Sequence, residues 1–275
     1  MHMDRRQFVK NLGLGTASLS MGSLVTASSC APSGDSSLKQ NVKEGEDGQF
    51  LFIGDDIAIA QTEYGKVQGY LLNHVYTFLG VPYGADTSGK NRFMPPQKPE
   101  PWTDVRPAVF YGNTAPQRME NRWPNNYGTF ADHWNYWDVS EDCLYLNVWT
   151  PGIADGKKRP VLVWLHGGGF TNGSGIEQDG YHGENISREG DIVFCSINHR
   201  LGPIGFSDLS GVGGEAYKDS GNVGMLDIIA ALRWVHDNIA NFGGDPGNVT
   251  VMGQSGGGSK VCTVAAMPAG KRFDP

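Results

Sequence analysis

A serine flanked by glycines gives this sequence its best candidate for covalent chemistry. Residues 253–257 read Gly-Gln-Ser-Gly-Gly and match the pattern G-x-S-x-G, in which a serine stands at a sharp turn between a strand and a helix. Side chains at Gly253 and Gly257 would collide with the neighbouring strand and helix, which explains why glycine is used there. Ser255 would then be an exposed nucleophile above the positive end of the next helix. A plain glycine–serine turn is the alternative, and five residues alone do not decide.

Three consecutive glycines provide a second chemical element at residues 166–170, which read His-Gly-Gly-Gly-Phe. Glycines leave backbone N–H groups free to converge on one oxygen, as in the oxyanion-hole loop of lipases and esterases. Two such groups and the N–H of Gly256 would give three donors for a tetrahedral oxyanion. A phosphate-binding loop is the alternative, but neither a Lys-Ser/Thr pair nor G-x-G-x-x-G follows.

The surrounding elements are those that could position these two segments. Apolar runs predict strands at 57–61, 66–72, 75–79, 144–149, 160–165, 192–197 and 249–252. Apolar residues at helical spacing predict a helix over 222–241, with a core face at Met225, Ile229, Leu232, Val235 and Ile239. The segment 257–266 can form the helix after the serine. We expect an α/β fold with a mostly parallel central sheet and an N-terminal antiparallel hairpin region.

Composition limits the classes of function. The chain has 275 residues, 39% of them hydrophobic, and a net charge of −7, which argues against nucleic acid as a partner. The sequence contains no run of 18 apolar residues, so no membrane-spanning helix is expected. No cofactor and no metal site is expected either.

The N-terminal residues indicate export. Arg5 and Arg6 precede a weakly apolar stretch that ends near Ser29, as in a twin-arginine signal that directs a protein to the periplasm or the exterior. A tail with two chance arginines is the alternative. Cys30 lies where a bacterial lipoprotein carries its lipid, although Ala27 stands where that motif prefers leucine. A lipid anchor at Cys30 and an unmodified cysteine both stay open.

The expected organisation is a signal at 1–30, a flexible linker at 31–50 and the N-terminal part of a folded domain over 51–275. Residues 123–137 hold six aromatic side chains without helical or strand period. They could line a cavity for a bulky or aryl substrate, or pack the segment onto the rest of the domain.

Four further segments resemble the type-B carboxylesterase and cholinesterase family: 140–148 (SEDCLYLNV), 198–206 (NHRLGPIGF), 221–227 (GNVGMLD) and 241–250. The resemblance covers residues 57–275. It implies an α/β-hydrolase fold, Ser255 as nucleophile, and Gly168, Gly169 and Gly256 as oxyanion donors. It also implies that Glu141 or Asp142 braces the fold by pairing with Arg200. We further assign Phe170 and Gln254, which adjoin these groups, to substrate binding.

The sequence departs from the family pattern in three ways. Gln254 and Gly256 stand where the family more often has glutamate and alanine. The partner that Cys143 usually has in a disulfide is replaced by Ala115, so no disulfide is expected. In the family the catalytic acid and histidine follow the serine, whereas all seven histidines of this chain precede Ser255. We therefore expect this chain to be a nearly inactive fragment that lacks the C-terminal half of the domain, with 249–252 as an exposed apolar edge.

The function predicted from these residues is hydrolysis of a small-molecule carboxylic ester through an acyl-enzyme on Ser255. A relative acting on peptides or lactams is a second enzymatic possibility. A non-catalytic binding module of the cholinesterase type is the alternative outside enzymes, although such modules generally lack the nucleophile that this chain keeps.

Overall fold

A computed structural model describes residues 50–118, 138–268 and 270 of the chain. The predicted export signal, Cys30, the linker and the aromatic segment 123–137 lie outside the described residues, so those predictions stay predictions.

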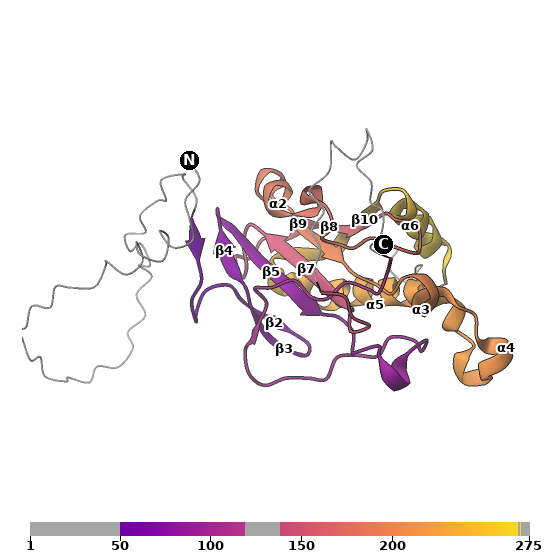
Figure 1. Cartoon of the computed structure of the whole chain (residues 1–275). Helices are drawn as coiled ribbons and strands as arrows, with labels where there is room; N and C mark the ends of the chain where they lie inside the picture. The colour runs from indigo at the N-terminus through magenta and orange to yellow at the C-terminus, as the bar shows by residue number, and fades with distance from the viewer. Residues whose placement is uncertain (1–49, 119–137, 269, 271–275) are drawn as a thin grey trace, which may run out of the picture. The chain divides into compact units, whose positions relative to one another are not determined.

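A seven-stranded mixed sheet forms the centre of the described fold (Figure 1). Its strands, in spatial order, are β1 (Leu51–Phe52), β4 (Tyr70–Leu72), β5 (Val75–Pro82), β7 (Tyr145–Thr150), β9 (Val193–Ile197), β8 (Arg159–Leu165) and β10 (Gly244–Gly253). The pairs β9–β8 and β8–β10 are parallel, whereas every pair from β1 through β9 is antiparallel. The antiparallel region therefore extends further along the sheet than the N-terminal hairpins.

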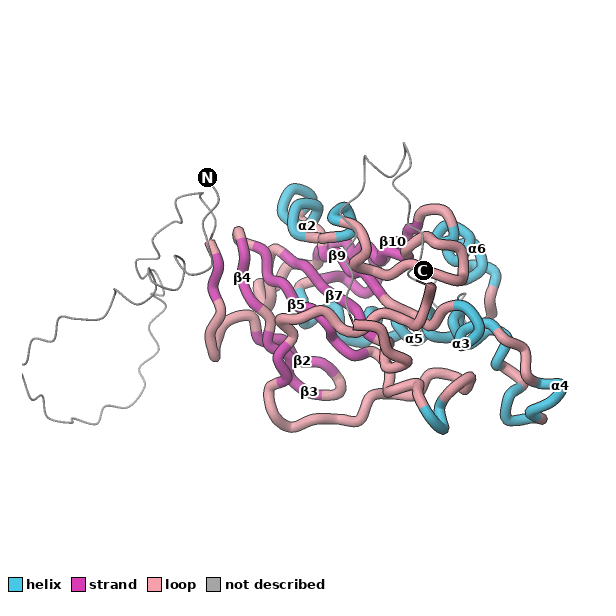
Figure 2. Tube along the Cα trace, in the orientation of Figure 1, coloured by secondary structure: helices cyan, strands magenta, loops and turns pink. Residues whose placement is uncertain are grey.

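A smaller sheet joins β2 (Ile59–Thr62), β3 (Gly65–Gln68) and β6 (Arg106–Pro107). The single strand predicted over 66–72 is wrong, because the chain divides it between β3 in this sheet and β4 in the large one. The break falls at Gly69, where an added Cβ would overlap the carbonyl oxygen of Thr77. Only glycine allows this close approach of two backbones, so the chain can change sheets there. From β5 to β7 the described chain is mostly loop (Figure 2).

The described helices are α2 (Glu184–Gly190), α3 (Gly202–Phe206), α4 (Ser210–Gly213), α5 (Val223–Asn238) and α6 (Gly256–Ala266), with 3₁₀ turns η1 (Gly89–Asn91), η3 (Asp179–Tyr181), η4 (Glu215–Tyr217), η5 (Ser220–Asn222) and η6 (Ile239–Phe242). Helices α2, α5 and α6 pack against strands of the large sheet, α3 packs against α5, and α4 lies away from the sheet (Figure 1). All five apolar positions predicted for the core face of the helix over 222–241 are buried, and its last turn is the 3₁₀ turn η6.

Two clusters of apolar side chains hold these layers together. Along β8, Val161, Val163 and Leu165 belong to the larger cluster, which contains the buried face of α5, while Leu162 and Trp164 pack against the smaller one around Trp149. Alternate side chains of a strand point to opposite faces, so the clusters lie on opposite sides of the sheet. All five residues of β9 are buried, as expected for a central strand covered on both faces.

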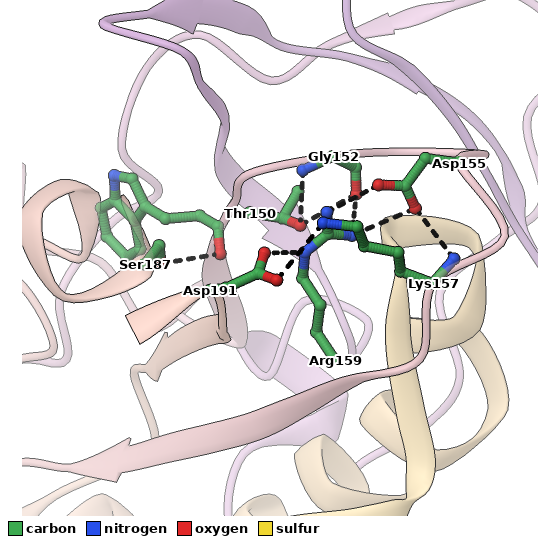
Figure 3. Close-up of polar contacts among 8 residues, drawn as sticks. Thr150, Gly152, Asp155, Lys157, Arg159, Ser187 and Asp191 are labelled. Atoms are coloured by element: carbon green, nitrogen blue, oxygen red, sulfur yellow. Dashed lines mark hydrogen bonds and ion pairs between the residues drawn. The ribbon is translucent and has the colours of Figure 1, made fainter. Parts of the chain in front are cut away.

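An arginine fixes the turn that leads from β7 into β8 (Figure 3). The guanidinium of Arg159 donates to Asp155 at 2.6 Å and to Asp191 at 2.7 Å, and it also bonds the carbonyl of Gly152. Arg159 holds the pKa of Asp155 down at about 2 through this hydrogen bond. Asp191 ends α2 in a left-handed conformation with φ of 47°. The cluster thus anchors the start of β8, the strand that leads into the glycine loop.

Candidate active site

Ser255 stands at the tip of a strained turn. β10 ends at Gly253 and α6 begins at Gly256, so the serine occupies the sharp connection between them. Its φ of 55° and ψ of −121° lie in a region that residues with a side chain rarely adopt. The residue is exposed. This is the strand–turn–helix context in which a G-x-S-x-G pattern presents a nucleophile.

The flanking glycines are required by packing. A Cβ at Gly253 would lie 2.5 Å from the carbonyl carbon of Gly257 and 2.7 Å from the oxygen of Leu165. A Cβ at Gly257 would overlap that same oxygen of Leu165. The helix therefore starts directly against the end of β8, and glycine is the residue that permits it.

The glycine loop 167–169 lies against this turn, because β8 and β10 are parallel neighbours and end at the same edge of the sheet. A Cβ placed on Gly256 would be 2.6 Å from the nitrogen of Gly169, and one placed on Gly167 would be 3.6 Å from Cβ of Ser255. Gly168 and Gly169 are exposed and have positive φ angles of 78° and 63°. Within the described part of the chain, nothing accepts a hydrogen bond from the N–H of Gly168, Gly169 or Gly256.

Phe170 and Gln254, the residues assigned to substrate binding, both lie beside the glycine loop. The half-buried ring of Phe170 packs edge-on against Phe206 at a centroid distance of 5.1 Å. The exposed side chain of Gln254 places its Oε1 only 2.8 Å from where a Cβ of Gly167 would lie. The structure therefore brings all six sequence-predicted site residues to one edge of the sheet.

The histidines of the described residues are placed for structural roles. The rings of His166 and His199 stack at 4.9 Å, and both side chains are buried. His199 Nδ1 lies 2.8 Å from the carbonyl oxygen of Arg200, and burial lowers the pKa of this ring to about 3. His182 packs against Trp149, and His236 lies beside Asp237 on the surface.

Lys260 is a site residue that the sequence analysis missed. It lies on α6, is fully buried, and donates a hydrogen bond to the carbonyl oxygen of His166 at 3.1 Å. Burial lowers its pKa to about 8. One sequence feature could have indicated Lys260: it is the only charged residue in a helix otherwise made of small and apolar residues.

The predicted partner of Arg200 is wrong. Arg200 forms two charge-assisted bonds with Asp227 of α5, at 2.6 Å and 2.8 Å, and both side chains are buried. Glu141 pairs instead with Arg92, and Asp142 accepts a hydrogen bond from the hydroxyl of Tyr145. A buried guanidinium needs a carboxylate that is buried with it, and the helix over 223–238 supplies one directly.

Cys143, Cys195 and Cys262 are free thiols, the first two of them buried. The described residues contain no group of three or more His, Cys, Asp or Glu side chains arranged to hold a metal ion. None of the helices in the described ranges combines the length and apolar composition needed to cross a bilayer.

A mixed sheet carrying a serine at a strand–helix turn beside a glycine loop defines an α/β-hydrolase. The chain belongs to the carboxylesterase family, whose model matches residues 56–273. Recognition of the family and of its fold from the sequence is thus confirmed.

Several relatives are similar in sequence. The chain is 44% identical over 216 residues to the para-nitrobenzyl esterase of Bacillus subtilis, covering 78% of this chain and 41% of that protein. It is also 44% identical to the phenmedipham hydrolase of Pseudarthrobacter oxydans over 215 residues, with coverages of 78% and 41%. The chain thus spans about two fifths of the length of these relatives.

A solved structure supports the assignment of the chain to the carboxylesterase family. An esterase of Clostridium hathewayi, reported to hydrolyse aliphatic aromatic polyesters, superposes with a TM-score of 0.74 at 42% identity. The match covers 81% of this chain and 42% of that one.

Proposed function

We propose that the protein is a serine carboxylic ester hydrolase that works through an acyl-enzyme on Ser255. The observation that carries the proposal is the exposed Ser255 with its left-handed φ, held against the backbone of the loop 167–169. A residue in such a strained conformation is kept where its position matters to function.

The proposed chemistry follows from the groups around Ser255. Its Oγ attacks the carbonyl carbon of the ester, and the N–H groups of Gly168, Gly169 and Gly256 stabilise the oxyanion that forms. Removing one such donor costs about 2.7–4 kcal/mol of transition-state stabilisation in a well-studied protease. The base passes the proton of the Ser255 hydroxyl to the alcohol, which leaves as its bond to the acyl carbon breaks, so that the acyl group stays on Oγ. Water then attacks the acyl carbon, the bond to Oγ breaks, and the acid is released while a proton returns to Ser255.

In this proposal, the base that activates Ser255 comes from outside the described residues. The buried pair His166 and His199 is stacked ring on ring, and burial keeps His199 neutral. A serine without its base retains about 10³–10⁴-fold catalysis over water, from the oxyanion donors and substrate binding. We therefore expect a form of the enzyme without that base to turn over esters poorly.

Aryl and benzyl esters are the first substrates to test, because relatives include a para-nitrobenzyl esterase and an esterase that hydrolyses aliphatic aromatic polyesters. The assay follows p-nitrophenyl acetate hydrolysis and fluorophosphonate labelling by the protein expressed from its complete reading frame. Ser255→Ala is expected to abolish labelling and to lower kcat/KM by at least about 10⁴-fold.

The matched control is Ser259→Ala, which removes another exposed serine one turn further along α6. It should label and hydrolyse like the parent. Binding of esters without turnover or labelling, in the parent protein, would replace this proposal with the non-catalytic binding module.

We also propose export by the twin-arginine route, on the basis of Arg5 and Arg6. Replacing both arginines with lysine should leave the protein in the cytoplasmic fraction. Labelling with a radioactive fatty acid, with Cys30→Ser as control, tests the lipid anchor. Unchanged export of the double variant contradicts the proposed route.

A further inference from the structure

We propose that Lys260 is a positioning residue for the oxyanion loop: its ammonium group ties the loop 166–170 to the helix that begins at the nucleophile. This inference rests on the proposed esterase function. It assigns a role to a buried cation that the hydrolytic chemistry above does not use.

The contacts of Lys260 are the first argument. Its Nζ donates to the carbonyl oxygen of His166, the first residue of the loop, at 3.1 Å. The same nitrogen lies 5.7 Å from the ring centroid of Phe170, the last residue of the loop, within the range of a cation–π contact. One side chain thus holds both ends of the segment that carries Gly168 and Gly169.

The place of Lys260 on α6 is the second argument. α6 begins at Gly256, directly after Ser255, so Lys260 belongs to the same rigid element as the third oxyanion donor. A tie from this helix to the loop fixes the spacing between the donors on the loop and the donor and nucleophile at the turn. A misplacement of about 1 Å in such a constellation can cost about 100-fold in rate.

The burial of Lys260 is the third argument. The side chain is fully buried, and burial is the largest influence on its pKa, which Glu177 partly offsets. Removing a charged ammonium from water is costly, and an apolar side chain of similar volume would fill the same space at less cost. Stability alone therefore does not explain a lysine at this position, whereas a hold on the loop does.

The test uses the protein expressed from its complete reading frame, with Lys260→Met and Lys260→Gln. Fluorophosphonate titration counts the competent sites, and kcat is then expressed per site. We expect Lys260→Met to lower kcat per site about 10- to 100-fold with KM nearly unchanged. Glutamine has the length of methionine but keeps an N–H donor, so Lys260→Gln should lose less.

The matched control is Val264→Ala, which removes buried side-chain volume on the next turn of α6. It should lower the number of folded sites after mild heating but leave kcat per site unchanged. A purely structural role for Lys260 predicts this same pattern for Lys260→Met. The proposal would be overturned if Lys260→Met lost folded sites but kept its kcat per site. It would also be overturned if Lys260→Gln had a lower kcat per site than Lys260→Met.

Hydrogen exchange separates failure of this inference from failure of the esterase proposal. The amide of Asn172 donates to the carbonyl of Gly168, and that of Gly202 donates to the carbonyl of Phe170, so both report on the loop. Lys260→Met should speed exchange at these two amides, and Val264→Ala should not. If the parent neither labels nor turns over ester, the esterase proposal fails, and unchanged exchange in Lys260→Met then overturns the positioning role as well.

Discussion

His199 couples the stability of the protein to pH at the scale of a single residue. Its pKa is 6.5 in an unfolded chain and about 3 in the fold, because the ring is buried and the cations Lys260 and Arg200 face it. Below pH 6.5 the unfolded chain binds a proton that the folded one does not, so stability is full above this pH and falls with acid. The slope from this group approaches about 1.4 kcal/mol per pH unit.

The variant His199→Asn tests this coupling, since its amide can keep a hydrogen bond to the carbonyl of Arg200, which His199 Nδ1 approaches at 2.8 Å. Urea unfolding at pH 7.0, 6.0 and 5.0 measures the free energy of unfolding of both proteins, in a range where ordinary carboxylates stay ionised. The parent should lose stability more steeply than the variant between pH 6 and 5. Parallel slopes would show that His199 accepts its proton in the folded state.

Single residues differ in how far the sequence alone predicts their surroundings. Ser255 and its glycines were predictable, because the turn they form depends on residues next to one another in the chain. The partner of Arg200 was not, because Asp227 lies 27 positions further along the chain, on α5. Lys260 was missed for the same reason, since its acceptor lies 94 positions earlier.

The junction of β8 and α6 makes a prediction at the scale of elements. A Cβ at Gly257 would overlap the carbonyl oxygen of Leu165, so Gly257→Ala must push the helix away from the strand. We expect a loss of at least about 2 kcal/mol in the free energy of unfolding, as in other overpacked interiors. Thermal and urea unfolding measure it.

The neighbouring residue is the control for this prediction. A Cβ at Gly258 would have its nearest neighbour at 3.5 Å, an ordinary contact, and the residue lies inside α6. Gly258→Ala should therefore be neutral or stabilising by up to about 1 kcal/mol, because alanine favours a helix over glycine. Equal effects of the two substitutions would mean that α6 does not rest on β8.

Elements with strong local patterns were predicted well, and those set by distant contacts were not. The helix predicted over 222–241 follows from its apolar period, and all five predicted core positions are buried, four of them in α5 and Ile239 in the 3₁₀ turn η6. The break at Gly69 depends on Thr77, which the chain brings opposite it only once β4 and β5 have paired. Strand order also lies beyond local pattern, because β9 enters between β7 and β8 although it follows both in sequence.

At the scale of the whole described domain, one buried ion pair connects three distant segments. Arg200 follows β9, Asp227 lies on α5, and a further nitrogen of the guanidinium donates to the carbonyl of Met94. The charged groups of both side chains are almost wholly buried, with exposures of 1% and 0%. In the described chain, the pair thus links the sheet, its covering helix and the long loop before β7.

Asp227→Asn should therefore destabilise the protein strongly, because it leaves the guanidinium of Arg200 buried without a counter-charge. We expect a loss of about 3–5 kcal/mol in the free energy of unfolding, measured in urea at pH 7. The matched control is Glu215→Gln, which breaks an exposed pair with Lys218 by the same chemical change and should leave the free energy of unfolding nearly unchanged. Adding Arg200→Met to Asp227→Asn should recover part of the loss, since it removes the unpaired charge. A double variant that loses the sum of both single effects would show that the two side chains act independently, and that the ion pair does not hold the segments together.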